Sequence, residues 1–152
     1  MIALVQSGRA QIALIEAQEV YPPDLTRSPV AERTEIALFV APTHALTRVQ
    51  NIDPQALQQH RELRLASIVS PYETRPLGRV WSAQSFLMLM EMAQLGFGWA
   101  QLPRWLVERF GNAGLVELNV RGWPRSVAVD ALWSRQYPPG PAGSWMLSQM
   151  LE

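Results

Sequence analysis

The stretch MEMAQLGFGWAQLP, from Met90 to Pro103, decides how the middle of the chain folds. Two glycines flank Phe97, as in half of a dinucleotide-binding loop, but such a loop needs a strand, then the glycines, then a helix. Here the order is reversed, because apolar residues recur at helical spacing before Gly96 and a short apolar run follows it. The stretch therefore predicts a helix that ends at Gly96 in the left-handed conformation. Gly98 then begins a buried strand, where its small size allows another backbone to approach closely.

Outward from this joint, short strands and helices alternate along the chain. Capping residues, prolines and glycines predict four helices. They are expected over residues 53–61, from Ser82 or Ser85 to Leu95, over residues 103–111 and over residues 141–151. Residues 1–8 resemble the last turns of a helix, and residues 21–33 and 137–143 read as loops. The pattern predicts an α/β fold with a substantially parallel sheet. Continuous apolar runs predict the strands, which begin at Gln11, Glu35, Leu63, Phe97, Leu115 and Ser126.

The composition is that of a globular chain. Its 152 residues suffice for about one domain with a real core, and 48% of them are hydrophobic. Thirteen basic residues balance thirteen acidic ones, so nothing favours nucleic-acid binding by this segment. No apolar run approaches the roughly 18 residues of a membrane span, and no secretory signal opens the chain, so we expect a cytoplasmic location and no membrane partner. The absence of cysteine excludes disulfides and thiolate chemistry.

No residue pattern indicates catalysis, and we expect the chain not to be an enzyme. His44 and His60 lack the spacing of metal ligands and have no carboxylate pair beside them. Ser70 and Ser85 lack the GxSxG turn that exposes a hydrolase nucleophile. We therefore expect no catalytic residue, no metal and no cofactor. Six tryptophans are many for this length, and most of them fit core packing, although one or two could line a pocket for an apolar ligand.

One segment, SIVSPYETRPLGRVWSAQSF from Ser67 to Phe86, does indicate a binding site. Polar side chains gather there where a strand ends and a helix begins. The first turn of a helix presents unpaired N–H groups and a partial positive charge, which suit a small anion such as a carboxylate. The alternative is ordinary helix capping. The polar residues of this segment are Ser70, Tyr72, Ser82, Gln84 and Ser85.

Four motifs follow one another along the chain in a familiar order. SGRAQIALIEA, from Ser7, is similar to a pattern sGrlDlai, and ALFVAPTHAL, from Ala37, to a strand followed by an HPL loop. SFLMLMEMAQLGFGWAQLPRWLVERFGNAGLVEL, from Ser85, is similar to a helix, aGlGwalLP, a second helix and G.Lv.L. In this order they resemble the effector-binding domain of LysR-type transcriptional regulators over nearly the whole chain. The chain departs from the family pattern at Ala45, where proline is usual, at Gln11, where aspartate is usual, and in a short linker from Ser70 to Trp81.

This resemblance implies a fold and a site. The family's domain is similar to a periplasmic solute-binding protein, with two α/β lobes joined by crossing strands and a small effector held between them. Residues 1–40 and 126–152 would form an incomplete first lobe, and residues 41–125 the second. An effector that touches both lobes would favour their closed arrangement through its differential affinity. The ligand implied is a small organic molecule, for which an anion is one option, and the expected effector-binding residues are Ser70, Tyr72, Gln84, Ser85, Phe86 and Trp99.

The resemblance also implies partners. Family members begin with a winged helix-turn-helix, a linker helix and the first strand, helix and second strand of lobe one, and this sequence contains none of them. We therefore expect DNA contact only through that absent N-terminal part, and a homodimer or tetramer that pairs helices at residues 1–8 and 84–95. The other interpretation of both helices is packing in their own core. A stand-alone solute-binding module is the alternative function, and a small α/β enzyme is a third.

Overall fold

The computed structural model describes residues 1–66 and 79–151, which divide into two compact units. Unit 1 comprises Met1–Thr34 with Ser126–Glu152, and unit 2 comprises Glu35–Arg125. The chain therefore passes between the units twice, once after Thr34 and once after Arg125.

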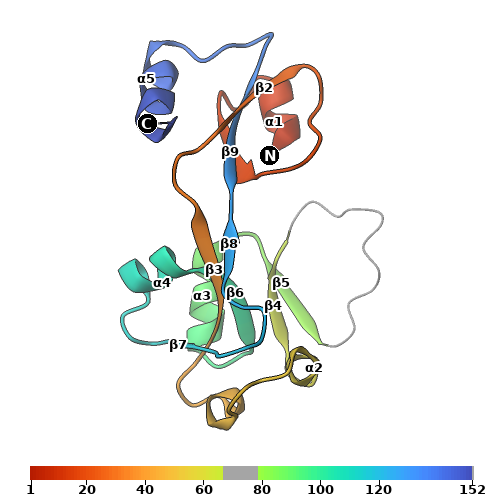
Figure 1. The fold of residues 1–152 in the computed structure, drawn as a ribbon, viewed down its shortest axis with the longest axis vertical. Coiled ribbons are helices and arrows are strands. Elements are labelled where there is room, and N and C mark those ends of the chain that lie inside the picture. The colour runs from red at the N-terminus through yellow and green to blue at the C-terminus, as the bar shows by residue number, and fades with distance from the viewer. Residues whose placement is uncertain (67–78, 152) are drawn as a thin grey trace. The chain divides into compact units, whose positions relative to one another are not determined.

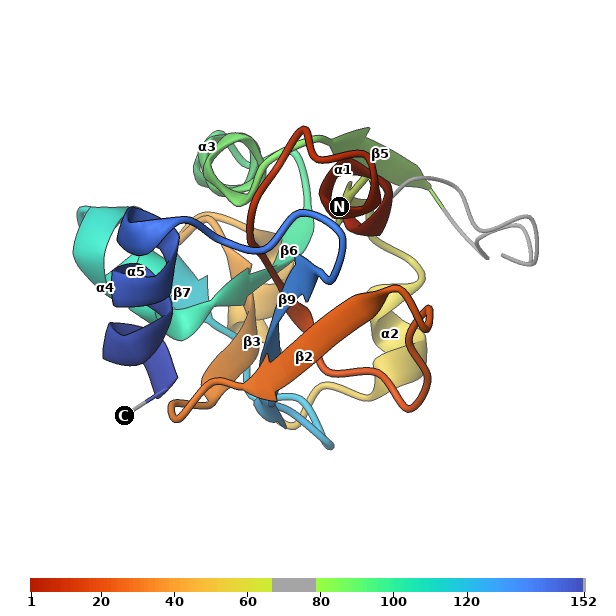
Figure 2. The ribbon, with the colours of Figure 1, turned by 90° about the horizontal axis from the view of Figure 1, so that it is seen from above.

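Unit 1 is built on a three-stranded antiparallel sheet. Its central strand, β9 (Val129–Ser134), pairs with β1 (Ala13–Glu16) on one side and with β2 (Leu25–Pro29) on the other. Figure 2 shows β9, in blue, beside β2, in orange. The unit also contains the helices α1 (Ile2–Gln6) and α5 (Pro141–Leu151). Its buried core joins α1 to all three strands through Val5, Ala13, Leu25 and Leu132.

A buried carboxylate, Asp130, lies in the central strand of this sheet. Its side chain accepts a hydrogen bond from the Tyr21 hydroxyl at 2.5 Å and another from Arg27 at 3.3 Å. The Tyr21 hydroxyl also accepts a hydrogen bond from the backbone N–H of Gln18 at 2.8 Å. Burial, and then the hydrogen bond to Asp130, raise the pKa of Tyr21. Because a buried charge is costly unless it is paired and hydrogen-bonded, this network holds the loop before β2 against β9.

Unit 2 is a mixed sheet flanked by short helices (Figure 1). β4 pairs in parallel with β5 and with β6, whereas β3 pairs antiparallel with β6 and with β7. Strand β8, which starts at Arg125 in unit 2 and continues into unit 1, also pairs with β3. The strands are β3 (Thr34–Val40), β4 (Glu62–Leu65), β5 (Val80–Ala83), β6 (Trp99–Pro103), β7 (Val116–Glu117) and β8 (Arg125–Val127). The helices are the 3₁₀ helix η1 (Ala45–Arg48), α2 (Pro54–Leu57), α3 (Phe86–Gln94) and α4 (Arg104–Phe110).

The sheet of unit 2 has a hydrophobic cluster on each face, because successive side chains of a strand point to opposite sides. Ala37 and Phe39 of β3 belong to one cluster, and Leu38 and Val40 to the other. The first, here called the α3 cluster, contains Leu89, Met90 and Ala93 of α3 together with Ala100, Leu102 and Leu106. The second, here called the α2 cluster, contains Leu46, Ile52, Leu57, Trp99, Leu118 and Val120.

The joint after α3 is confirmed. Gly96 has a φ of +82°, its N–H donates to the Ala93 carbonyl at 3.0 Å, and the Phe97 N–H donates to the Met92 carbonyl at 3.1 Å. These two bonds are those of a Schellman motif, which satisfies the last carbonyls of a helix. A Cβ atom at Gly98 would lie 2.2 Å from the carbonyl oxygen of Arg61. Any side chain at position 98 would therefore collide with the backbone that leads into β4, and only glycine fits there. Strand β6 itself begins one residue later, at Trp99.

The helix predictions are confirmed, with shorter bounds in the case of α2. Ser85, and not Ser82, caps α3, and Asp53 caps α2 by accepting a hydrogen bond from the Gln55 N–H at 2.9 Å. Two strands were missed, β2 and β5, and both lie at a sheet edge among the described strands, where polar side chains replace an apolar run.

The prediction of a substantially parallel sheet is wrong. Unit 1 is antiparallel throughout, and unit 2 is mixed. The apolar run of β3 reflects the two clusters that cover both of its faces. Burial on both faces produces such a run whichever way the neighbouring strands point, so the run does not report strand direction.

Candidate functional site

The first turn of α3 holds two of the six predicted site residues. Ser85 is the N-cap, and its hydroxyl oxygen accepts a hydrogen bond from the Met88 N–H at 3.2 Å. Phe86 is the first residue of the helix and packs, partly buried, on the α3 cluster. Helix geometry leaves the N–H groups of Phe86 and Leu87 without an intrahelical partner. This turn can therefore still donate to an anion, with Ser85 serving as cap at the same time.

Gln84 stands immediately before the cap, at the carboxyl end of β5. It is exposed, and β5 delivers it there by pairing in parallel with β4 along Val80–Ala83. The carboxyl ends of parallel strands, followed by helix starts, are where crevices form in α/β sheets. Gln84, Ser85 and Phe86 are thus brought together on one short connection from strand to helix.

Trp99 lies elsewhere in the unit. It is 7% exposed, belongs to the α2 cluster, and its indole N–H donates to the Leu57 carbonyl at 3.0 Å. The next residue, Ala100, points into the α3 cluster, so the side chains of Trp99 and Phe86 belong to clusters on opposite faces of the sheet. Ser70 and Tyr72 fall outside the described residues. The roles of these three residues in effector binding stay predictions.

An aromatic group that includes Trp81 of β5 was not found from the sequence. The Arg61 guanidinium stacks over the Trp81 ring at 3.9 Å and donates to the Phe97 carbonyl at 3.3 Å. The rings of Trp81 and Phe97 lie 5.5 Å apart, and both are more than 40% exposed. The Nε atom of Arg61 is buried without a hydrogen-bond partner in the described part of the chain. Pairing of β4 with β5 creates this contact, which spacing along the sequence did not reveal.

The two histidines come close together, although their sequence spacing gave no sign of it. The rings of His44 and His60 have their centroids 5.1 Å apart. Nδ1 of His44 accepts a hydrogen bond from the Leu46 N–H at 3.2 Å, so the outer nitrogen carries the proton in the neutral ring. Burial, and then the charge of His60, lower the pKa of His44. Over residues 1–66 and 79–151, no group of three or more histidine, aspartate or glutamate side chains is placed to hold a metal ion.

Comparison with known proteins identifies the domain. The LysR substrate binding domain family matches residues 1–152. The HTH-type transcriptional regulator MetR of Escherichia coli strain K12 is 29% identical over 138 residues, which cover 85% of this chain. That match covers 41% of the relative, so the chain spans less than half the length of a regulator that it resembles. None of the helices in the described ranges is long and apolar enough to cross a membrane.

Solved structures agree with this comparison at the level of the fold. The cofactor-binding domain of the Cbl transcriptional regulator superposes with a TM-score of 0.73, at 17% identity, over 99% of this chain and 69% of that one. The effector-binding domain of QuiR, solved in complex with shikimate, superposes with a TM-score of 0.72, at 15% identity, over 99% of this chain and 74% of that one. The α/β fold is therefore the periplasmic-binding-protein-like fold of LysR regulatory domains. With a family match along its entire length, this chain belongs to the LysR substrate-binding domain family.

Proposed function

We propose that this chain is the effector-sensing domain of a LysR-type transcriptional regulator and that it binds a small organic acid at the start of α3. The main support is the family match over residues 1–152, together with the open first turn of α3. The MetR relative is an HTH-type regulator that extends well beyond the matched region. In this proposal a helix-turn-helix elsewhere in the regulator contacts DNA, and the protein works in the cytoplasm.

The lobes predicted from the family resemblance correspond, in this proposal, to the two compact units. Unit 1 supplies the first lobe and unit 2 the second, with the chain crossing after Thr34 and after Arg125. An effector can shift the state of the regulator only by its difference in affinity between two arrangements. In this proposal, the residues at the start of α3 are the part of unit 2 that contacts the effector and contributes to that difference in affinity.

The chemistry of the α3 start favours a carboxylate. Free N–H groups and the positive end of the helix dipole attract an anion, and the exposed Gln84 amide adds two donors. Ser85 uses one lone pair to accept the Met88 N–H and keeps its own O–H free to donate. Shikimate, the ligand in the QuiR structure, is a small carboxylic acid of the kind that such donors bind.

A thermal-melt screen against small carboxylic acids, aromatic acids and neutral sugars tests the proposal. A ligand at about 100 times its Kd stabilises the folded state by roughly 2.7 kcal/mol. For a chain of this size that gain raises Tm by about 5 to 10 °C. Selective stabilisation by an acid supports the proposal, and a cooperative melt that no member of the screen shifts contradicts it.

Two variants then locate the site. Gln84→Ala should weaken binding of the acid found by the screen at least tenfold and leave Tm without ligand unchanged, because Gln84 is exposed and caps nothing. Ser85→Ala should weaken binding and also cost about 1 kcal/mol of stability, because the helix loses its cap. Ser148→Ala, an exposed serine on α5, is the matched control. Equal affinities in all four proteins would remove the α3 start from the site.

We also propose that the outer face of α3 contacts a second copy of the chain. Leu87 and Met88 are 51% and 53% exposed, although they are large apolar side chains. Pairing this face in a homodimer would remove that apolar surface from water. The double variant Leu87→Lys with Met88→Lys should sediment as a monomer at concentrations where the parent chain dimerises. Val49→Lys, at an exposed valine outside α3, should leave the sedimentation unchanged, and dimers of the double variant would refute this contact.

A further inference from the structure

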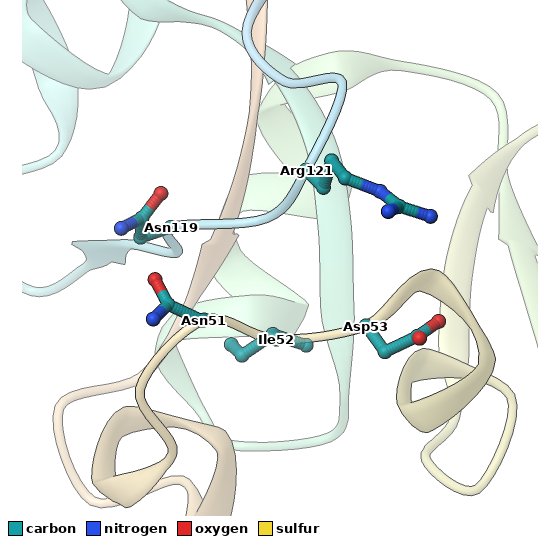
Figure 3. Close-up of a pocket in the computed structure, with 5 residues that line it drawn as sticks. All are labelled: Asn51, Ile52, Asp53, Asn119 and Arg121. Carbon is teal, nitrogen blue, oxygen red and sulfur yellow. The ribbon is translucent and has the colours of Figure 1, made fainter.

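A pocket of about 370 Å³ lies in unit 2, away from α3. It forms where residues 51–53 and residues 119–121 run side by side, joined by a parallel bridge between Ile52 and Val120. The Ile52 N–H donates to the Asn119 carbonyl at 3.2 Å. The side chains of Ile52 and Val120 are at most 2% exposed and belong to the α2 cluster. These two apolar anchors fix both segments, and the polar side chains beside them face the pocket (Figure 3).

The lining of the pocket carries one cationic side chain, one anionic side chain and two amides. Figure 3 shows the amides of Asn51 and Asn119 near one end, and the Asp53 carboxylate with the Arg121 guanidinium near the other. The Arg121 guanidinium makes no hydrogen bond or ion pair with any residue of the described ranges. Asp53 uses one carboxylate oxygen to cap α2 and keeps the other free. A cation and an anion therefore face the same space without pairing with each other at 4 Å or less.

We infer that this pocket binds a small zwitterion that also carries a neutral hydrogen-bonding group, the class to which free polar amino acids belong. The guanidinium of Arg121 offers a fork of N–H donors that matches a ligand carboxylate. The free oxygen of Asp53 accepts from a ligand ammonium, and the amides of Asn51 and Asn119 can both donate to and accept from a side-chain amide or hydroxyl. The volume lies in the range of small-molecule sites.

This site is separate from the one at the start of α3. The pocket borders the α2 cluster, whereas α3 packs on the other face of the sheet. The inference therefore does not rest on the proposed function, and Gln84→Ala should leave binding in this pocket unchanged. Nothing in the sequence indicated a binding site at these residues, because 51–53 and 119–121 become neighbours only through the bridge between Ile52 and Val120.

The test is a titration of the ¹⁵N-labelled chain with L-glutamine and with L-serine, followed by amide chemical shifts. We expect saturable shifts centred on residues 51–53 and 119–121 with at least one of these two probes. Arg121→Gln should weaken that binding at least tenfold, and Arg48→Gln, at an exposed arginine outside the pocket, should not. The absence of saturable shifts at these residues with both probes would overturn the inference, as would equal affinity in Arg121→Gln and the parent chain.

A second variant separates ligand contact from damage to the fold. Asp53→Asn removes the negative charge but keeps a side chain that caps helices as well as aspartate does. It should bind L-glutamine at least tenfold more weakly than the parent chain. Glutaramate, which is glutamine without its ammonium group, should bind Asp53→Asn at least as tightly as it binds the parent chain, because it has no ammonium for the Asp53 charge to contact and is an anion. If Asp53→Asn loses affinity for L-glutamine and for glutaramate to the same extent, the proposed contact between Asp53 and the ligand ammonium is contradicted.

Discussion

Gly98→Ala should be among the most damaging single-methyl additions to this chain. The added Cβ would lie 2.2 Å from the Arg61 carbonyl oxygen, whereas an ordinary contact between carbon and oxygen needs about 3.3 Å. The backbones of β4 and β6 must then separate by about 1 Å, which stretches the 3.0 Å hydrogen bond from the Trp99 N–H to Arg61 beyond bonding distance. A lost buried hydrogen bond costs about 1 to 3 kcal/mol, and overpacking a further 1 to 3 kcal/mol. We therefore expect a loss of about 3 kcal/mol.

Gly96→Ala provides the comparison, because it adds the same methyl group two residues away. No atom lies within 4 Å of the Cβ position there, so only the left-handed φ of +82° opposes the change, at about 1 to 2 kcal/mol. Urea unfolding followed by tryptophan fluorescence measures both losses, and Tm should fall by about 6 to 12 °C in Gly98→Ala. A Gly98→Ala chain that is as stable as the parent chain, or more stable than Gly96→Ala, would show that β4 and β6 do not clash with the added methyl group.

Three further perturbations follow from the buried polar groups. Trp99→Phe should cost about 1 kcal/mol in urea unfolding, because the Leu57 carbonyl loses the buried indole donor and keeps only the His60 N–H; an unchanged midpoint would contradict this. Tyr21→Phe should destabilise the chain by about 1 to 3 kcal/mol, since Asp130 keeps its buried charge but loses a donor at 2.5 Å, and a cost below 0.5 kcal/mol would refute this reading. The pKa of His44 in the folded chain lies below its ordinary value of 6.5, so the unfolded chain binds a proton at His44 at a higher pH than the folded chain does. The free energy of unfolding should therefore be highest above about pH 6.5 and should decrease as the pH falls towards the pKa of His44 in the folded chain. NMR titration of the His44 ring should show this low pKa, and His60→Gln should raise it; an unaltered value would exclude the charge of His60 as a cause.

Local signals in the sequence indicated the α-helices and the joint, but they did not indicate η1, and they left the cap of α3 open between Ser82 and Ser85. The cap at Ser85, the left-handed Gly96 and the tight Gly98 each depend on residues within one turn or on one close neighbour, so residue type alone indicated them. Strand direction was not predictable in this way, because a run such as that of β3 records burial and not the direction of its neighbours. Edge strands were missed for a related reason, since β2 has only one paired neighbour in the described sheet and carries three consecutive polar residues, Thr26, Arg27 and Ser28, in place of an apolar run.

The candidate site was predictable only where it is continuous along the chain. Gln84, Ser85 and Phe86 are consecutive, and the signature of a helix start identified them together. Contacts between distant segments, such as Arg61 with Trp81, arise from strand pairing and leave no mark in the spacing of residues. Trp99 was grouped with Phe86 through the family resemblance, and the alternation along β6, which turns its side chain into the α2 cluster, was not used in that prediction.

The position of β6 between two hydrophobic clusters gives the domain a form of modularity. Trp99 fills space in the α2 cluster, and its neighbours Ala100 and Leu102 fill space in the α3 cluster. A change of volume at one of these positions is felt first on one side of the strand, so natural variation can reshape the surroundings of α3 while the opposite cluster keeps its packing. Substitutions on one face of β6 should therefore leave the packing on its other face largely intact.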